Sequence, residues 1–179
     1  MAAPPHVLRE YALLADGYRG VLVGPEGDFA WMCAPRWDSP AVFSSLMGSD
    51  CSYAVTPRGR FVWGGYYEDG SLVWRSRWIT GGGGIVEGRE ALALPADAHR
   101  AVLLRRVHAV RGRAEVEVTL APGADFARHG LDALRRDDEG HWHGRTGDLR
   151  MRWSGAGAAR PDGARLRTAV RGTGRDFPR

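Results

Sequence analysis

The amino-acid sequence predicts an all-β domain, an antiparallel β-sandwich with at most one or two short helices. Three observations predict this fold: apolar and polar residues alternate in short runs, turn-forming residues stand where each run ends, and helical periodicity is scarce. The chain has 179 residues and is 44% hydrophobic, which is enough for one domain with a single core. Its 25 glycines and 10 prolines favour short strands joined by frequent turns.

Residues 113–120 have the clearest alternation of a half-buried strand. Apolar side chains occupy every second position, and arginine, glutamate and threonine take the positions between them. Such a strand places one face in the core and the other in water. Weaker alternation predicts further strands at 72–80, 149–153 and 166–170.

Turn signals separate the runs. Residues 24–28, Gly-Pro-Glu-Gly-Asp, lie between apolar runs at 21–23 and 29–33 and predict a hairpin. The four glycines at 81–84 also predict a flexible hairpin loop. They lack the helix and the following Lys and Ser or Thr that a phosphate-binding loop requires.

One short helix and one domain boundary complete this prediction. Residues 40–47 are predicted to form one or two helical turns, with Ser39 as N-cap and Pro40 at the first helical position. The last residues are polar and glycine-rich and lose the alternation. We therefore expect a single domain at 1–171, followed by a linker or a frayed end at 172–179.

All 25 basic residues are arginine, and the formal net charge is +4. Arginine binds phosphate well, but these arginines are spread along the chain, whereas a nucleic-acid footprint is a patch. We therefore expect no nucleic-acid partner. No apolar stretch approaches the ~18 residues of a membrane span. The first 17 residues lack the pattern of a signal peptide, so no membrane contact is expected.

The other reactive residue types carry no recognisable site. Cys33 and Cys51 are too few for a disulfide scaffold and lack a neighbouring base, so we expect reduced, buried thiols and a cytoplasmic location. His141 and His143 have a spacing that suits a metal, but no third ligand lies near them. We expect surface histidines beside a buried Trp142, with no metal site, no cofactor and no catalytic residue.

The loop at 35–40 combines a cation, an aromatic ring and a carboxylate between two rigid prolines. Its residues are Pro35, Arg36, Trp37, Asp38, Ser39 and Pro40. In a structural interpretation, Asp38 caps the following turn or pairs with Arg36. In a functional interpretation, Arg36, Trp37 and Asp38 face a ligand or a neighbouring domain. The chemistry of these residues leaves both interpretations open.

Four segments near the N-terminus resemble the opening of glycoside hydrolase family 15, the bacterial and archaeal glucoamylase- and trehalase-like enzymes. They are E-Y-A-L-L-A-D-G at 10–17, V-L-V-G at 21–24, G-D at 27–28 and W-M-C-A-P-R-W-D-S-P at 31–40. The segment L-A-P-G-A-D-F at 120–126 resembles a later family motif. Ala15, Ala30 and Leu92 depart from the family pattern, which indicates a divergent member.

The resemblance implies a β-sandwich N-terminal domain that is followed, in the family, by a linker and an (α/α)6 barrel. Family members hydrolyse glycosidic bonds with inversion of configuration at the anomeric carbon, using two carboxyl groups. In the family both groups belong to the barrel, and no glutamate of this chain matches them. We therefore predict a non-catalytic domain that packs against and supports a barrel acting on α-glucans or trehalose. The implied partners are that barrel and a glucoside at the domain interface, which the loop at 35–40 is expected to reach.

Self-association, carbohydrate binding and nucleic-acid binding are the remaining possibilities that the sequence raises. A sandwich that docks on a barrel exposes an apolar face, so self-association through that face is expected. Because the chain has seven tryptophans, a stand-alone carbohydrate-binding module is the alternative function, with exposed rings stacking on sugars. An arginine-mediated nucleic-acid binder, recognisable by steep salt dependence, is the least favoured.

Overall fold

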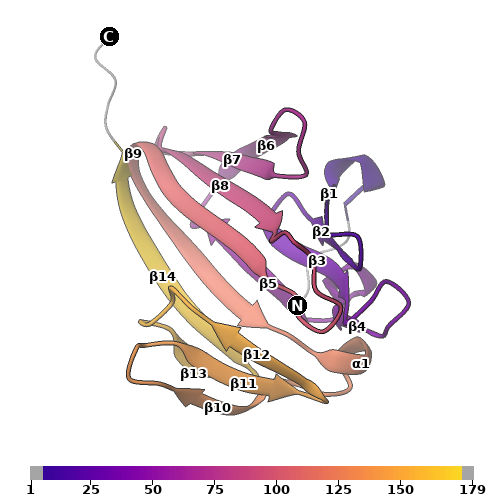
Figure 1. Cartoon of the computed structure of the whole chain (residues 1–179). Helices are drawn as coiled ribbons and strands as arrows, with labels where there is room; N and C mark the ends of the chain where they lie inside the picture. The colour runs from indigo at the N-terminus through magenta and orange to yellow at the C-terminus, as the bar shows by residue number, and fades with distance from the viewer. Residues whose placement is uncertain (1–5, 175–179) are drawn as a thin grey trace.

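The computed structural model describes residues 6–174, and every strand pairing within them is antiparallel (Figure 1). The strands are β1 (Ala12–Ala15), β2 (Gly20–Val23), β3 (Asp28–Cys33), β4 (Ala41–Phe43), β5 (Ser52–Pro57), β6 (Phe61–Tyr67), β7 (Trp74–Thr80), β8 (Ile85–Leu92), β9 (Leu103–Ala121), β10 (Asp132–Arg136), β11 (Trp142–Thr146), β12 (Leu149–Trp153), β13 (Arg160–Asp162) and β14 (Arg165–Gly174). The short helical segments are η1 (Leu8–Glu10), η2 (Ser45–Met47) and α1 (Ala124–Ala127). The predicted all-β fold is confirmed.

One large, curled sheet forms most of the domain. Its strand order is β1-β2-β3-β5-β9-β8-β7-β6, with β4 beside β3, β14 beside β9, and β13 beside β14. The two ends of this order meet where the Tyr67 hydroxyl of β6 donates to the Leu13 carbonyl of β1 (3.0 Å) and accepts from the Leu13 N–H (2.7 Å). The layers expected of a sandwich are therefore mainly two halves of one sheet.

A second sheet, β10-β11-β12, lies beside the lower end of β14 in Figure 1. Its two tryptophans, Trp142 and Trp153, are each 8% exposed and belong to the common core. The Trp153 indole N–H donates to the Tyr53 hydroxyl on β5 (3.2 Å). The small sheet is thus packed onto the large one, and the predicted burial of Trp142 is confirmed.

The longest strand, β9, connects the two halves of the large sheet. Its first half, from Leu103 to Arg111, pairs with β8. Its second half pairs with β5 through 116–121 and with β14 through 112–120. The face predicted at 113–120 is confirmed, because Val116, Val118 and Leu120 are buried in the core.

A buried ion pair fixes the curl of the sheet. The side chains of Glu90 on β8 and Arg105 on β9 are both almost fully buried and hydrogen-bonded to each other. Arg105 also donates to the carbonyls of Tyr53 and Gly27, and its guanidinium lies 4.2 Å from the centroid of the Phe29 ring. These contacts join β8 and β9 to β3 and β5. The hydrogen bonds offset part of the desolvation of both charges, although the buried Nε of Arg105 has no hydrogen-bond partner among the described residues.

The predicted helix at 40–47 is wrong. Residues 41–43 instead form β4, whose Phe43 pairs with Met32 and whose Ala41 pairs with Cys33 of β3. Only Ser45–Met47 forms a short 3-10 turn. Burial against β3 and α1 outweighs the local signal that Ser39 and Pro40 provide for a helix start.

The other predicted turns and strands agree with the structure, with two differences at their ends. The hairpins at 24–28 and 81–84 join β2 to β3 and β7 to β8. Strand β7 begins at Trp74, so Leu72 lies in an exposed turn. Strand β14 continues to Gly174, past the boundary expected at 171. Residues 175–179, in the expected linker, lie outside the described residues.

Candidate functional site

The loop at 34–40 is a turn that its own hydrogen bonds hold closed. The Arg36 N–H donates to the Ser39 hydroxyl (3.2 Å), and the Ser39 N–H donates back to the Arg36 carbonyl (3.1 Å). The Ala34 N–H and the Pro40 carbonyl, 3.5 Å apart, close the base of the loop. Ser39 therefore stabilises this turn instead of capping a helix.

Trp37 fixes the loop to the turn between β1 and β2. Its N–H donates to the Tyr18 carbonyl (3.1 Å), and its indole ring lies on Gly20. A Cβ atom at Gly20 would stand 2.0 Å from the ring atom Cη2, so only glycine accommodates this contact. The Trp37 side chain nonetheless remains 50% exposed. The ring is thus held in place and accessible at the same time.

Arg36 and Asp38 lie at the tip of the loop as an ion pair of 3.2 Å. Their side chains are 64% and 72% exposed. An exposed pair of this kind contributes little to stability. The Arg36–Asp38 pair that the structural interpretation expects is therefore present. Both charges and the Trp37 ring are nonetheless exposed to solvent.

The turn beneath Trp37 is rigid because a second buried ion pair supports it. Asp16 accepts hydrogen bonds from the N–H groups of Tyr18 and Arg19 (2.9 Å each), and the Arg19 side chain, 1% exposed, lies 3.4 Å from the Asp16 carboxylate. Arg19 also donates to the Asp97 carbonyl in the loop between β8 and β9. Three loops are therefore joined at this end of the domain.

The strand register places Trp37 on a larger apolar surface. Leu13 pairs with Leu22, and Leu22 pairs with Trp31, so these side chains share the sheet face on which Trp37 covers Gly20. The opposite face carries buried core residues such as Leu14, Val21 and Met32. We call the exposed side the outer apolar face. Its members are Leu13, Leu22, Trp31, Trp37 and Phe126.

Phe126 completes this face from an unusual backbone conformation. Its ring lies 6.1 Å from the ring of Trp31 and is 49% exposed. Asp125, Phe126 and Ala127 have φ angles of 52°, 55° and 70°, so α1 is a left-handed turn. Each such residue costs about 1–2 kcal/mol, and strain of this kind persists only where the surrounding structure enforces it.

A single threonine enforces the left-handed turn. The Thr146 hydroxyl, buried on β11, accepts from the Ala124 N–H (2.7 Å) and donates to the His129 carbonyl (2.5 Å). The His129 N–H in turn donates to the Ala124 carbonyl (3.1 Å). Of the five residues of this face, the sequence singled out Trp37 alone. It missed Leu13, Leu22 and Trp31, and for Phe126 the resemblance at 120–126 was the only signal.

The two cysteines and the histidines at 141 and 143 do not form a second candidate site. Burial raises the pKa of the Cys33 and Cys51 thiols, which opposes a nucleophilic role. His143 hydrogen-bonds Asp137 (2.7 Å), and this contact lowers the pKa of that carboxyl. His141 lies 3.4 Å from the same carboxylate. In 6–174, no three His, Cys, Asp or Glu residues are grouped to hold a metal ion.

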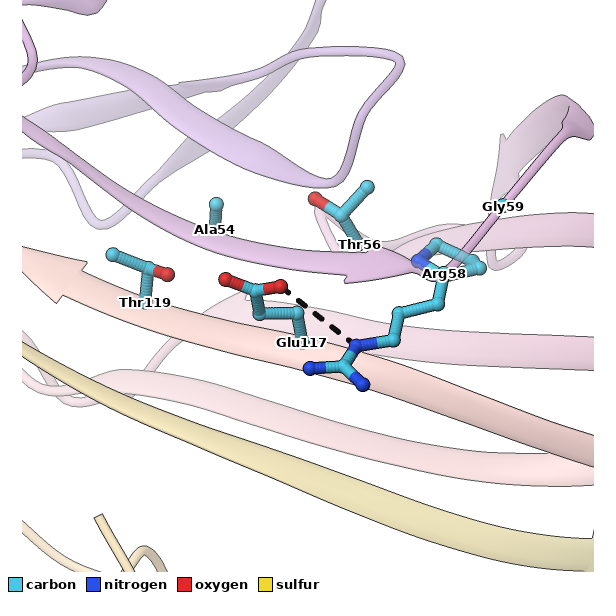
Figure 2. A pocket seen from close by; sticks show the side chains of 7 residues that line it. Ala54, Thr56, Arg58, Gly59, Glu117 and Thr119 are labelled. Carbon is cyan, nitrogen blue, oxygen red and sulfur yellow. Dashed lines mark ion pairs between the residues drawn. The ribbon is translucent and has the colours of Figure 1, made fainter. Parts of the chain in front are cut away.

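The depression on the outer side of β5 and β9 is a solvated ladder of ion pairs (Figure 2). Arg58 points toward Glu117 (3.9 Å) and lies 2.8 Å from Glu115. Arg167 and Arg171 on β14 pair with the same two glutamates from the other side. Both carboxylates are thus neutralised by arginine, and neither is arranged as an acid or a base toward a shared reaction centre.

Comparison with known proteins identifies relatives of this chain. The sequence profile described as trehalase-like, N-terminal matches residues 2–157. The trehalase of Mycobacterium tuberculosis (strain ATCC 25618 / H37Rv) is 30% identical over 146 residues, which cover 71% of this chain and 21% of that protein. The trehalase of Mycolicibacterium smegmatis (strain ATCC 700084 / mc(2)155) is 28% identical over 144 residues, which cover 70% and 21%.

The chain therefore spans about a fifth of the length of the curated relatives it matches. No solved structure matches it significantly. Strand β14 lies beyond the matched residues 2–157, although its Leu166 is fully buried in the core. None of the helices within 6–174 has the length and apolar character needed to cross a membrane.

Proposed function

Because the chain belongs to the family of trehalase-like N-terminal domains, we propose that its outer apolar face docks on the catalytic domain of a longer glycoside hydrolase and supports that domain. The main observation in favour of docking is that apolar side chains of this face are exposed to solvent. The outer side of a two-layered β fold is normally polar. Here Leu13, Trp37 and Phe126 of the outer apolar face are 39%, 50% and 49% exposed. A surface of this composition is typical of a protein interface.

The structure around the face supports a role in docking. The Trp37 ring is fixed by Gly20, and the Phe126 ring by the turn that Thr146 enforces, so little side-chain entropy is lost when a partner binds. Two exposed ion pairs, Arg36–Asp38 and Asp125–Arg128, lie at its margin. Aromatic anchors in the centre with charges at the rim are the usual anatomy of an interface.

The catalytic partner in this proposal is an (α/α)6 barrel of the family 15 type, cytoplasmic and acting on α-glucans or trehalose by inversion. The support is the sequence resemblance together with the relatives, which are trehalases about five times as long as the matched segment. The catalytic carboxyls would both be on the barrel. Arg36, Trp37 and Asp38 would lie at the interface or at the rim of its active site, within reach of a bound glucoside.

The test compares this chain alone with the same chain joined to the catalytic region of its parent enzyme. We expect the amides of 31–38 and 124–129 to exchange more slowly in the joined protein, and Trp37→Ala with Phe126→Ala to lower its activity or its melting temperature. Leu104→Ala, on an exposed position of β9, is the matched control. Equal exchange rates and an unaffected double variant would contradict docking through this face.

A carbohydrate-binding module is the second candidate, because the Trp37 ring is exposed beside the charged groups of Arg36 and Asp38. Titration of maltooligosaccharides or trehalose against tryptophan fluorescence separates the two functions. Saturable quenching that is lost in Trp37→Ala supports the module, and no quenching supports the docking domain. Weak self-association of the isolated chain through the outer apolar face is expected in either case.

A further inference from the structure

Strand β6 ends the large sheet and has one unpaired edge. It pairs with β7 over seven residues, Phe61 to Tyr67, and no other described strand pairs with it. In Figure 1 it lies at the top of the molecule, on the far side of β7 from β8. Its side chains are accessible, with Val62 63%, Trp63 39% and Tyr66 51% exposed. At its C-terminal end this edge approaches the outer apolar face, because the Tyr67 hydroxyl is hydrogen-bonded to the backbone of Leu13 on β1.

The strand lacks three of the features that normally prevent sheets from joining. Proteins protect an open edge with charged side chains, proline, a bulge or a covering loop. The sequence of β6, F-V-W-G-G-Y-Y, contains no charge and no proline, and its pairing with β7 has no register shift. A long, flat, apolar edge of this kind is a site for the addition of another strand.

The backbone groups that face the open edge follow from the pairing. The hairpin bonds from Glu68 N–H to the Val73 carbonyl and from Gly81 N–H to the Arg60 carbonyl place the even-numbered residues in hydrogen-bonded pairs with β7. The odd-numbered residues of β6 therefore direct their N–H and C=O groups to the free side. These residues are Phe61, Trp63, Gly65 and Tyr67.

We propose that β6 pairs with β6 of a second copy of this chain, antiparallel and centred on Gly64, to form a symmetric dimer with one continuous sheet. A two-fold axis at Gly64 pairs all seven residues, and it places each odd-numbered residue opposite another odd-numbered one. About eight backbone hydrogen bonds then form across the axis. A two-fold interface uses the same patch on both copies, as this edge requires.

The side chains favour this register over its neighbours. With the axis at Gly64, Val62 lies opposite Tyr66 of the second copy, an aliphatic–aromatic pair that stabilises antiparallel strands. Just outside the strand, Arg60 lies opposite Glu68 of the second copy. The Glu68 carboxylate already hydrogen-bonds Arg75 and Arg89 of its own chain, so this contact adds only a weak, exposed ion pair at each end of the interface. Arg60 has no ion-pair partner within 6–174. Moving the axis to Trp63 or Gly65 removes this ion pair and leaves two β6 residues of each copy without a partner on the other β6 strand.

A cysteine at the axis tests the register directly. A Cβ atom at Gly64 meets nothing within 4 Å, so Gly64→Cys is compatible with the fold. In the proposed dimer the two cysteines are directly opposite in a non-hydrogen-bonded pair, at a Cα separation of about 4.5 Å that suits a disulfide. We expect Gly64→Cys to form a disulfide-linked dimer under mild oxidation. Val62→Cys, whose two copies are about 14 Å apart, and the unsubstituted chain are the controls and remain unlinked.

Association without a cross-link is measured by sedimentation velocity across a concentration series. We expect a monomer–dimer equilibrium in which Val62→Lys weakens dimerisation about tenfold or more, because lysine on an edge strand opposes pairing. Leu104→Lys, at an apolar position of β9 that is 50% exposed, leaves the equilibrium unchanged. In the dimer, amide exchange slows at residues 61, 63, 65 and 67, while the even-numbered amides are already protected by β7.

Three results would overturn the proposal. The first is a monomer at every soluble concentration. The second is a dimer that Val62→Lys leaves intact while changes on the outer apolar face dissolve it, which would place self-association on that other surface. The third is efficient cross-linking of Val62→Cys in place of Gly64→Cys, which would exclude the Gly64 register. The variants at 62 and 64 leave Trp37 and Phe126 unchanged, so failure here leaves the docking proposal, which those two residues test, untouched.

Discussion

The indole of Trp37 lies against the backbone of Gly20, at a distance that leaves no room for a methyl group. This contact fixes the position of the whole loop at 34–40. We predict that Gly20→Ala displaces the ring, destabilises the domain by about 1–3 kcal/mol through overpacking and shifts the tryptophan fluorescence. Urea unfolding measures the first effect. Gly82→Ala, where a Cβ meets nothing within 4 Å, is the control. An unshifted spectrum would show that Trp37 does not depend on Gly20.

The Glu90–Arg105 pair gives the largest expected stability effect. Glu90→Gln leaves the Arg105 charge buried without its partner, and the loss of one member of such a pair costs about 3–5 kcal/mol. The change is measured as a lower urea midpoint with an unaltered slope. Glu139→Gln, at a side chain that is 77% exposed, should change stability by less than about 0.5 kcal/mol. Similar midpoints for both variants would rule out the proposed role of the buried pair.

Stability should fall in acid partly through Glu68. Hydrogen bonds from Arg89 and Arg75 lower the pKa of Glu68 from 4.5 to about 2. A carboxyl whose pKa is lower in the folded state adds stability above its unfolded pKa and loses that contribution as the pH falls toward the folded pKa. The stability difference between the unsubstituted chain and Glu68→Gln should therefore shrink between pH 4.5 and about 2. Asp138→Asn, at an exposed position in the turn between β10 and β11, is the control. A difference that stays constant over this range would contradict the assignment.

Thr146 is predicted to control the position of Phe126. Thr146→Val keeps the shape of the side chain but removes the acceptor for the Ala124 N–H and the donor for the His129 carbonyl. We expect a loss of about 1–3 kcal/mol, since buried polar groups lose their partners, and faster amide exchange at 124–129. Thr119→Val, on the solvent side of β9, is the control. Unchanged exchange at 124–129 would mean that other contacts hold the left-handed turn.

Alternation of apolar and polar residues predicted the strands whose buried face is entirely apolar. It failed to predict a strand where a polar residue occupies a buried position. The run at 113–120 lies within β9, but the first half of the same strand was not predicted. In that half, the charged residue Arg105 points into the core, so polar and apolar residues do not alternate. Its partner Glu90 lies on another strand, and the local sequence therefore gives no sign that the charge is buried. The β6 edge escaped prediction for the opposite reason, since its apolar residues do not alternate with polar ones.

The candidate site was only partly predictable. The loop at 35–40 was identified from its residue types, and the structure leaves both of its interpretations in force. The outer apolar face requires the pairing of Leu13, Leu22 and Trp31 across three strands, which local patterns do not contain. The left-handed turn at Asp125 and Phe126 violates local preference, so only its long-range anchor, Thr146, explains it.

The central place of β9 also determines how the chain can fold. Its partners β5 and β14 are about 60 and 50 residues away along the chain, and contacts of such long range slow folding. The last strand, β14, is the one that covers the second half of β9. During synthesis, one edge of β9 at Val116, Val118 and Leu120 therefore remains unpaired until residues up to Val170 have left the ribosome. A chain cut before β14 would keep all of residues 2–157, which match the family, and still be prone to aggregation.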